Sequence, residues 1–101
     1  MKTKVYIVKP NENGYVAEID NTLESYQQII GGYIQVCYLD DGLLAIVDEE
    51  GLIKGLPLNL ILDRYGFISG NVIFVRDDGK GDFESLTDKD IENLERLYGG
   101  E

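Results

Sequence analysis

A chain of 101 residues is long enough for one domain with a modest core, and 44% hydrophobic residues with 7 Tyr and 3 Phe exclude a disordered acidic tail. The net charge of −10 at pH 7 disfavours direct binding to nucleic acid, because phosphates are neutralised by Lys and Arg. With no histidine, the chain lacks the commonest general acid/base and metal ligand, so we expect a binding protein and not an enzyme.

The single cysteine and the apolar runs favour a cytoplasmic protein. Cys37 lies in an apolar segment and is predicted to be a buried hydrophobic residue, which fits a reducing compartment. The basic start resembles that of a signal peptide, but Lys9 and Pro10 end its apolar stretch after four residues. No later run has the length of a membrane span, so we expect no membrane association.

The N-terminal third predicts a β-hairpin followed by a short helix. Residues 2–9 and 15–19 have extended patterns, and the residues between them have turn chemistry. Asn21 and Glu24 have the spacing of a capping box, and a pair of glycines can end a helix predicted over residues 22–30. Leu23, Tyr26, Gln27 and Ile30 fall on one face of this predicted helix.

The central part predicts a second hairpin and a second helix. Residues 33–39 and 43–48 are rich in β-forming side chains and are joined by an Asp-Gly turn. Residues 52–54 are predicted to be a short extended piece. Pro57 suits the first turn of a helix, which we predict over residues 57–64.

The C-terminal part predicts a central strand and a final helix. Residues 72–75 are apolar without alternation, as in a strand buried on both faces. The polar loop 77–82 has glycines where an EF-hand needs oxygen ligands, which excludes that motif. Thr87 and Asp90 have capping-box spacing. The helix after them should dock on the sheet through Ile91, Leu94 and Tyr98.

These elements predict a single α+β domain over residues 1–101, with one mostly antiparallel sheet packed with about three short helices. Without histidine, and with one cysteine, the chain cannot assemble a Ser-His or Cys-His nucleophile system or a thiolate zinc site. We therefore expect no catalytic residues, no metal and no cofactor.

Negative charge is concentrated near the C-terminus, where residues 77–101 hold nine acidic and three basic residues. Asp88, Glu92 and Glu95 fall on one helical face at about 5–6 Å from one to the next, which resembles the spacing of phosphates along a strand. The alternative is a solvated face with a Glu92 to Arg96 ion pair. The candidate partner-binding residues are Asp77, Asp78, Asp82, Glu84, Asp88, Glu92 and Glu95.

Two other groups of residues are candidates for binding. Tyr33 and Tyr38 are five positions apart on one strand, so at least one should lie away from the main core, either as a binding anchor or packed beneath another element. A small-molecule binder that sequesters a signal nucleotide is an alternative function, for which a local positive pocket would be needed. Its candidate residues are Lys2, Lys4, Lys9, Lys54, Arg64 and Arg76.

The most specific motifs are Gly31-Gly32-Tyr33-Ile34 and Gly55-Leu56-Pro57-Leu58-Asn59, supported by residues 18–25 and 49–52. With them the chain resembles a small uncharacterised family of phage and plasmid proteins, the domain of unknown function numbered 3846. The likeness runs from about Lys4 to the start of the final helix. It supplies no catalytic residues.

The resemblance implies an accessory protein of a mobile element, and small acidic proteins of this kind are often antagonists of host defence. It therefore implies a cytoplasmic, non-enzymatic inhibitor that binds a basic protein surface on a host nuclease. The expected target is the nuclease of a type II CRISPR system, which makes the chain an anti-CRISPR protein. An acidic DNA mimic directed against restriction enzymes is an alternative.

Overall fold

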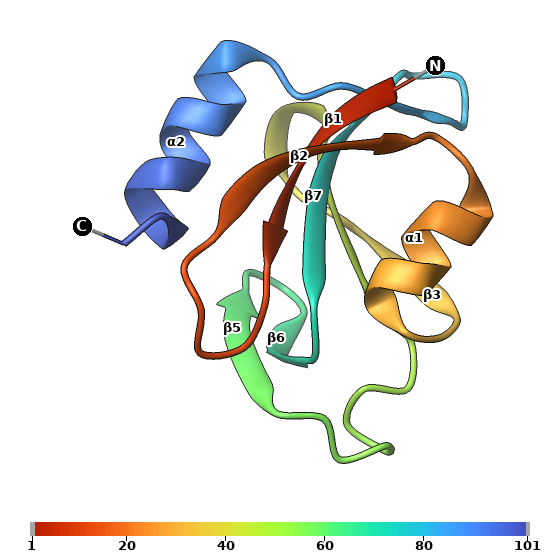
Figure 1. Cartoon of the computed structure of the whole chain (residues 1–101), viewed down its shortest axis with the longest axis vertical. Helices are drawn as coiled ribbons and strands as arrows, with labels where there is room; N and C mark the ends of the chain where they lie inside the picture. Colours follow the sequence, from red (N-terminus) through yellow and green to blue (C-terminus); the bar gives the residue numbers. More distant parts are fainter. Residues whose placement is uncertain (1, 101) are drawn as a thin grey trace.

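The computed structural model describes residues 2–100, which form a six-stranded sheet, a two-stranded sheet and two α-helices (Figure 1). The strands are β1 (Lys2–Val8), β2 (Tyr15–Asp20), β3 (Ile34–Tyr38), β4 (Leu43–Asp48), β5 (Leu58–Leu62), β6 (Gly66–Ser69), β7 (Val72–Asp77) and β8 (Phe83–Glu84). The helices are α1 (Leu23–Ile30) and α2 (Asp88–Tyr98), and a 3-10 turn covers Asp40–Gly42.

The larger sheet is antiparallel at each of its pairings and has the order β2-β1-β7-β4-β3, with β8 also pairing with β7. The two predicted hairpins are β1 with β2 and β3 with β4. In the turn of the second, Asp41 and Gly42 adopt the positive φ angles, 58° and 81°, that a tight connection between strands uses. As predicted, β7 is a central strand, and Val72–Val75 are buried.

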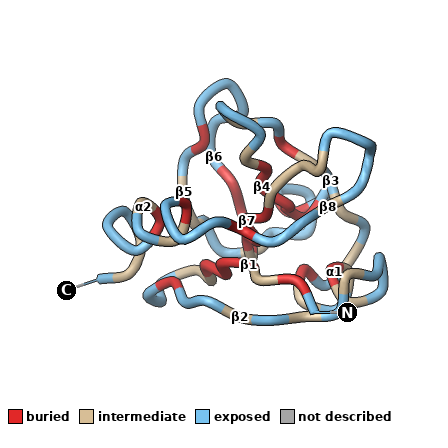
Figure 2. The backbone as a smooth tube through the Cα atoms, turned by 90° about the horizontal axis from the view of Figure 1, so that it is seen from above, coloured by how far each residue is buried: buried red, intermediate tan, exposed pale blue. Residues whose placement is uncertain are grey.

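Both faces of this sheet are covered, so its central strands are apolar on both sides. Along β1, Val5 and Ile7 face α1, whereas Tyr6 and Val8 face the opposite layer, as the period of a strand requires. That opposite layer consists of α2 together with the β5–β6 hairpin. Figures 1 and 2 show α1 on one side of the sheet and α2 with the hairpin on the other.

The helix α1 lies where the sequence places it, but its N-cap is one residue later than predicted. The Thr22 hydroxyl accepts a hydrogen bond from the Ser25 amide, and Gly31, at φ 89°, ends the helix. Asn21 has a longer-range role instead, because its side-chain amide donates to the Phe83 carbonyl oxygen. Of the four residues on the predicted helical face, Tyr26 and Ile30 are buried and Leu23 is exposed.

Two predictions between β4 and β6 are wrong. Residues 52–54 form a turn and not an extended piece, and residues 57–64 contain β5 in place of a helix, so the domain has two α-helices and not about three. The cause is tertiary: β5 pairs with β6, and the Asn59 amide donates to the carbonyl oxygens of Val8 and Gly70, at 2.8 Å each. These contacts outweigh the local signal of a proline in a first helical turn.

The helix α2 confirms the prediction for the C-terminal part. Thr87 and Asp90 form both hydrogen bonds of a capping box. Leu94 is buried, and Ile91 and Tyr98 pack against the same cluster, so the helix docks on the sheet along the predicted stripe. None of the helices within residues 2–100 combines the length and the hydropathy needed to cross a membrane.

Candidate functional site

The acidic residues of the loop after β7 bond mainly to the loop itself. Asp78 accepts hydrogen bonds from the amides of Lys80, at 2.7 Å, and Asp82, at 3.1 Å, and these bonds lower its pKa. Asp77 accepts from the Gly79 amide, and Asp82 from the Phe83 amide. Short acidic side chains commonly shape turns in this way, so three predicted partner-binding residues have a local structural role.

The predicted acidic stripe lies on the exposed side of α2. Glu92 pairs with Lys89 at 3.3 Å and with Arg96 at 4.0 Å, so part of its charge is neutralised within the helix. Within residues 2–100, neither Asp88 nor Glu95 forms an ion pair. The stripe therefore retains two unpaired carboxylates. Glu84 is exposed on β8, outside the helix.

Glu95 also affects the core beneath it. Burial of Tyr6, followed by the nearby Glu95 carboxylate, raises the pKa of the Tyr6 hydroxyl to about 12. Both causes favour the neutral phenol. The inner end of the stripe therefore borders a buried, neutral tyrosine.

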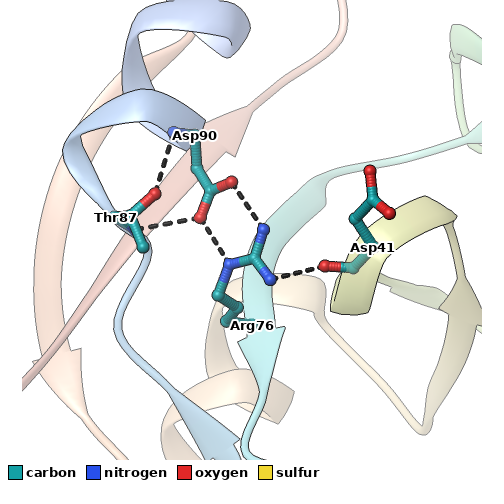
Figure 3. Close-up of polar contacts among 4 residues, drawn as sticks. All are labelled: Asp41, Arg76, Thr87 and Asp90. Atoms are coloured by element: carbon teal, nitrogen blue, oxygen red, sulfur yellow. Dashed lines mark hydrogen bonds and ion pairs between the residues drawn. The ribbon is translucent and has the colours of Figure 1, made fainter.

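One carboxylate of this segment is buried and structural. Arg76 on β7 donates two hydrogen bonds to Asp90 on α2, at 2.6 and 2.7 Å, and a third to the Asp41 carbonyl oxygen, at 2.6 Å (Figure 3). Asp90 also accepts from the Thr87 amide. The bonds from Arg76 are the main reason that the pKa of Asp90 falls to about 2. This cluster ties α2, β7 and the β3–β4 turn together.

The basic residues proposed for a phosphate pocket are mostly engaged with carboxylates. The pairs are Lys2 with Asp20, Lys54 with Asp48, Arg64 with Asp40 and Arg76 with Asp90. Only Lys4 and Lys9 of the six are outside these pairs. The charge available to a phosphate is correspondingly reduced.

The cysteine and the carboxylates are the remaining groups that could take part in catalysis or metal binding. Cys37 is fully buried, as predicted, and burial raises the pKa of its thiol, which disfavours the nucleophilic thiolate. Within residues 2–100, no three of the Cys, Asp and Glu side chains are grouped to hold a metal ion.

The structure contains an apolar patch that was not predicted from the sequence. It is formed by side chains that are 60–87% exposed, those of Leu52, Ile53, Leu58, Ile61 and Phe67. Ile61 and Phe67 are partners across the β5–β6 pairing, and with Leu58 they line a hollow of about 330 Å³. Phe67 also borders a second hollow of about 290 Å³, which Leu52 and Ile53 line. Phe67 thus connects the hairpin to the loop before it, and the patch is continuous.

Carboxylates border this apolar patch. Glu49 and Glu50 line the second hollow, and Asp63 lies beside Ile61 in a neighbouring hollow. Among the residues that line these hollows, Arg64 is the single basic residue, and it pairs with Asp40. The patch therefore combines apolar side chains with a negative border.

The two tyrosines of the β3 segment are both largely exposed, at 68% for Tyr33 and 59% for Tyr38. The prediction that at least one lies away from the core is confirmed. The sequence carried only a partial signal for the patch: residues 52–67 contain many large apolar side chains, but it is the fold that leaves some of them exposed. Interpreting residues 57–64 as a helix concealed it.

Comparison with curated proteins and with solved structures gave no significant match. Comparison with protein families gave a match over residues 1–99, nearly the whole chain, to the family described as "Domain of unknown function (DUF3846)". The chain belongs to this family.

Proposed function

We propose that this protein is a non-enzymatic inhibitor that docks on the basic surface of a nucleic-acid-handling enzyme. The observation that carries the proposal is the apolar patch with its acidic border. Single exposed apolar residues are ordinary on protein surfaces, whereas a continuous patch rimmed by polar groups marks an interaction site. Fully exposed side chains such as Ile53, at 87%, add nothing to the stability of the free domain but can be buried by a partner.

The residues of the patch suit a protein partner. Phe67 lies between the two hollows, and an aromatic residue at the centre of an interface commonly carries much of the binding energy. The surrounding carboxylates steer a basic partner towards the patch and oppose an acidic one. In this proposal the protein acts by binding its partner and not by catalysis. Cys37, which is buried, and Asp90, which is paired with Arg76, then have structural roles only.

The acidic stripe of α2 supports the same type of partner. The hairpin β5–β6 and α2 cover the same face of the sheet (Figure 2). The part of the patch on the hairpin and the stripe on α2 therefore belong to one layer. An enzyme that holds nucleic acid presents the positive channel that this charge favours. Of such enzymes, we propose the type II CRISPR nuclease as the first target and a restriction endonuclease as the second.

The test compares the wild-type protein with the double variant Ile61→Ser, Phe67→Ser. Surface plasmon resonance would measure binding to each enzyme, with the nuclease both free and loaded with guide RNA, and cleavage assays would measure inhibition. The wild-type protein should bind one enzyme and inhibit cleavage. The double variant should bind at least about thirtyfold more weakly, because a central anchor contributes about 2 kcal/mol or more.

The matched control is the double variant Val16→Ser, Leu23→Ser, which removes exposed apolar side chains from β2 and α1. It should bind and inhibit as the wild-type protein does. Absence of wild-type binding to every enzyme would contradict the proposed targets. Undiminished binding by the Ile61, Phe67 variant would contradict the role of the patch.

A further inference from the structure

The two edges of the main sheet differ in their protection. β2 carries Glu18 and Asp20, and charged side chains on an edge strand discourage pairing with another chain. β3, at the opposite edge, has the sequence Ile-Gln-Val-Cys-Tyr, without a charge or a proline. An edge strand of this composition is a template for a further strand.

The backbone of β3 presents hydrogen-bonding groups at that edge. The Glu49 amide donates to the Tyr33 carbonyl oxygen, and the Leu39 amide donates to that of Leu43, so the odd-numbered residues of β3 bond to β4. The groups of Ile34, Val36 and Tyr38 therefore point away from β4. Among the hydrogen bonds of residues 2–100, none involves the outward amides or carbonyls of Ile34 and Val36.

One end of the edge is already closed. The Tyr38 amide donates to the Tyr65 hydroxyl at 2.9 Å, and its carbonyl oxygen accepts from Arg64 at 3.3 Å. Both side chains come from the β5–β6 turn. The open part of the edge is thus the portion at Ile34 and Val36.

A hollow lies beside the same strand. The 290 Å³ hollow is lined by Gln35 and Cys37 of β3 and by Phe67 of β6, together with apolar side chains of the loop after β4. A strand added to β3 would direct every second side chain to the face that Gln35 and Cys37 occupy. Strand addition needs free backbone groups, which supply affinity, and a side-chain pocket, which supplies selectivity. The free groups of Ile34 and Val36 and this hollow meet both needs.

We propose that an extended segment of a partner protein pairs with β3 at Ile34 and Val36 and places an apolar side chain in this hollow. The segment carries Lys or Arg at both ends, because Glu49 and Glu50 lie at one end of the β3 edge, and Asp41, next to the Asp40 that pairs with Arg64, lies at the other. This inference rests on the proposed function, since the segment belongs to the same docking partner.

Charge favours a partner segment over a second copy of this chain. Antiparallel pairing of β3 with β3 of another copy would bring Glu49 and Glu50 of one molecule towards Asp40 and Asp41 of the other. Like charges that are brought closer together repel each other, which disfavours this pairing. The net charge of −10 adds to this repulsion.

The first test uses a probe peptide of alternating valine and threonine with lysines at both ends, and hydrogen exchange of the wild-type protein followed by NMR. At saturating peptide, exchange of the Ile34 and Val36 amides should slow at least about tenfold, whereas that of Val16 and Glu18 on β2 should not change. Unchanged exchange at Ile34 and Val36 would overturn the proposal. So would equal binding of a peptide N-methylated at every amide, because complete methylation removes all the donors that could pair with β3.

The second test compares Val36→Pro with Val36→Ala. Proline removes the outward amide but no bond to β4, since Val36 does not donate to that strand, and alanine is the control for lost side-chain packing. The proline variant should bind the peptide about tenfold more weakly than the alanine variant. Equal affinity of the two variants would overturn the proposal.

Two measurements separate this inference from the proposed function. If Val36→Pro binds the target enzyme as Val36→Ala does while the Ile61, Phe67 variant does not bind, docking stands and strand addition is overturned. A wild-type dimer in sedimentation velocity that Val36→Pro converts to a monomer would also overturn it, in favour of pairing between copies. Peptide binding at β3 without binding to any enzyme would support the edge site and contradict the targets alone.

Discussion

Arg76 and Asp90 show how one carboxylate of an acidic segment becomes part of the fold. Asp90 is buried, and two hydrogen bonds from the Arg76 guanidinium keep it ionised. Its pKa falls from the ordinary value of 3.8 to about 2. A carboxyl with a lowered pKa stabilises the folded state above its unfolded pKa, and this contribution is lost as the pH falls through the folded pKa.

We expect this pair to make the free energy of unfolding fall at acid pH, a decrease that we call the acid limb. The shift corresponds to about 2 kcal/mol, which should be lost between about pH 4 and pH 2. In Arg76→Gln, the Asp90 carboxylate loses its partner, so the free energy of unfolding at pH 7 should fall by about 3 kcal/mol and the limb should flatten. Urea denaturation over this pH range measures both quantities.

The control for this prediction is Arg96→Gln, which removes an exposed guanidinium from a 4.0 Å pair with Glu92. Its free energy of unfolding should change by less than about 0.5 kcal/mol. An acid limb that persists unchanged in Arg76→Gln would show that other carboxyl groups are responsible for it.

At the scale of single residues, the sequence predicted what depends on near neighbours. Thr87 and Asp90 are three positions apart, so their capping box was predicted and is confirmed. The contact of Asp90 with Arg76 spans 14 positions and depends on the docking of α2, which no local pattern records. For the same reason, Asn21 was interpreted as a cap, although it bonds to Phe83 at a separation of 62 positions.

Among the secondary-structure elements, β5 depends most on distant contacts. The Asn59 amide joins this strand to the end of β1 and to the residue after β6, through Val8 and Gly70. Replacement by alanine would leave two carbonyl oxygens without this donor. Unsatisfied buried polar groups cost roughly 1–3 kcal/mol each.

We therefore expect Asn59→Ala to destabilise the protein by about 2 kcal/mol and to loosen the β5–β6 hairpin. Hydrogen exchange of the amides of β5 and β6 should accelerate more than that of β1 and β7. The control is Asn13→Ala, at an exposed loop position, whose effect should stay within about 0.5 kcal/mol. Uniform acceleration over all strands would contradict a local role for Asn59.

The hairpins and the final helix were predicted from contacts between residues close in sequence, and β7 from its continuous apolar run. β1 with β2, and β3 with β4, are hairpins closed by short turns, and α2 has its own cap. The helix prediction for residues 57–64 failed for two reasons. The contacts that stabilise β5 come from β1 and β6, and Pro57 before a run of leucines is also compatible with a helix start.

For the whole molecule, the distribution of charge determines what surfaces it can approach. If the stripe on α2 contacts a basic partner, the triple variant Asp88→Asn, Glu92→Gln, Glu95→Gln should weaken that complex at least about tenfold and reduce its salt dependence. Stability should change little, because these side chains are exposed and the pairs of Glu92 are solvent-accessible. Burial, the larger cause of the raised Tyr6 pKa, keeps this phenol neutral without the Glu95 charge. Binding measured over a series of salt concentrations tests this.

The matched control for the stripe is Glu12→Gln, Glu18→Gln, Glu24→Gln, which removes the same charge from exposed positions in other parts of the fold. A general effect of net charge would weaken binding equally in both triple variants. A contact at the stripe should affect the first variant more strongly. Equal affinities for the wild-type protein and the first variant would leave the stripe as a solvated helix face.

The candidate site was only partly accessible from the sequence. Charge can be counted along the chain, so the acidic C-terminal segment was identified, and its role in binding stays a prediction. The apolar patch depends on which side chains are exposed in the folded domain. Leu58 and Phe67 are exposed because β5 and β6 pair as a hairpin over the sheet. An apolar residue in a sequence is expected to be buried until the fold shows otherwise.

None of the five side chains of the apolar patch belongs to either buried cluster of the domain. Substitutions at these positions are therefore nearly neutral for folding, since the core that holds the sheet and helices together does not use them. If the patch binds the proposed partner, recognition and foldability are encoded by separate sets of residues. The scaffold could then change its partner by successive surface substitutions, each compatible with the same architecture, and so adapt to a target that itself varies.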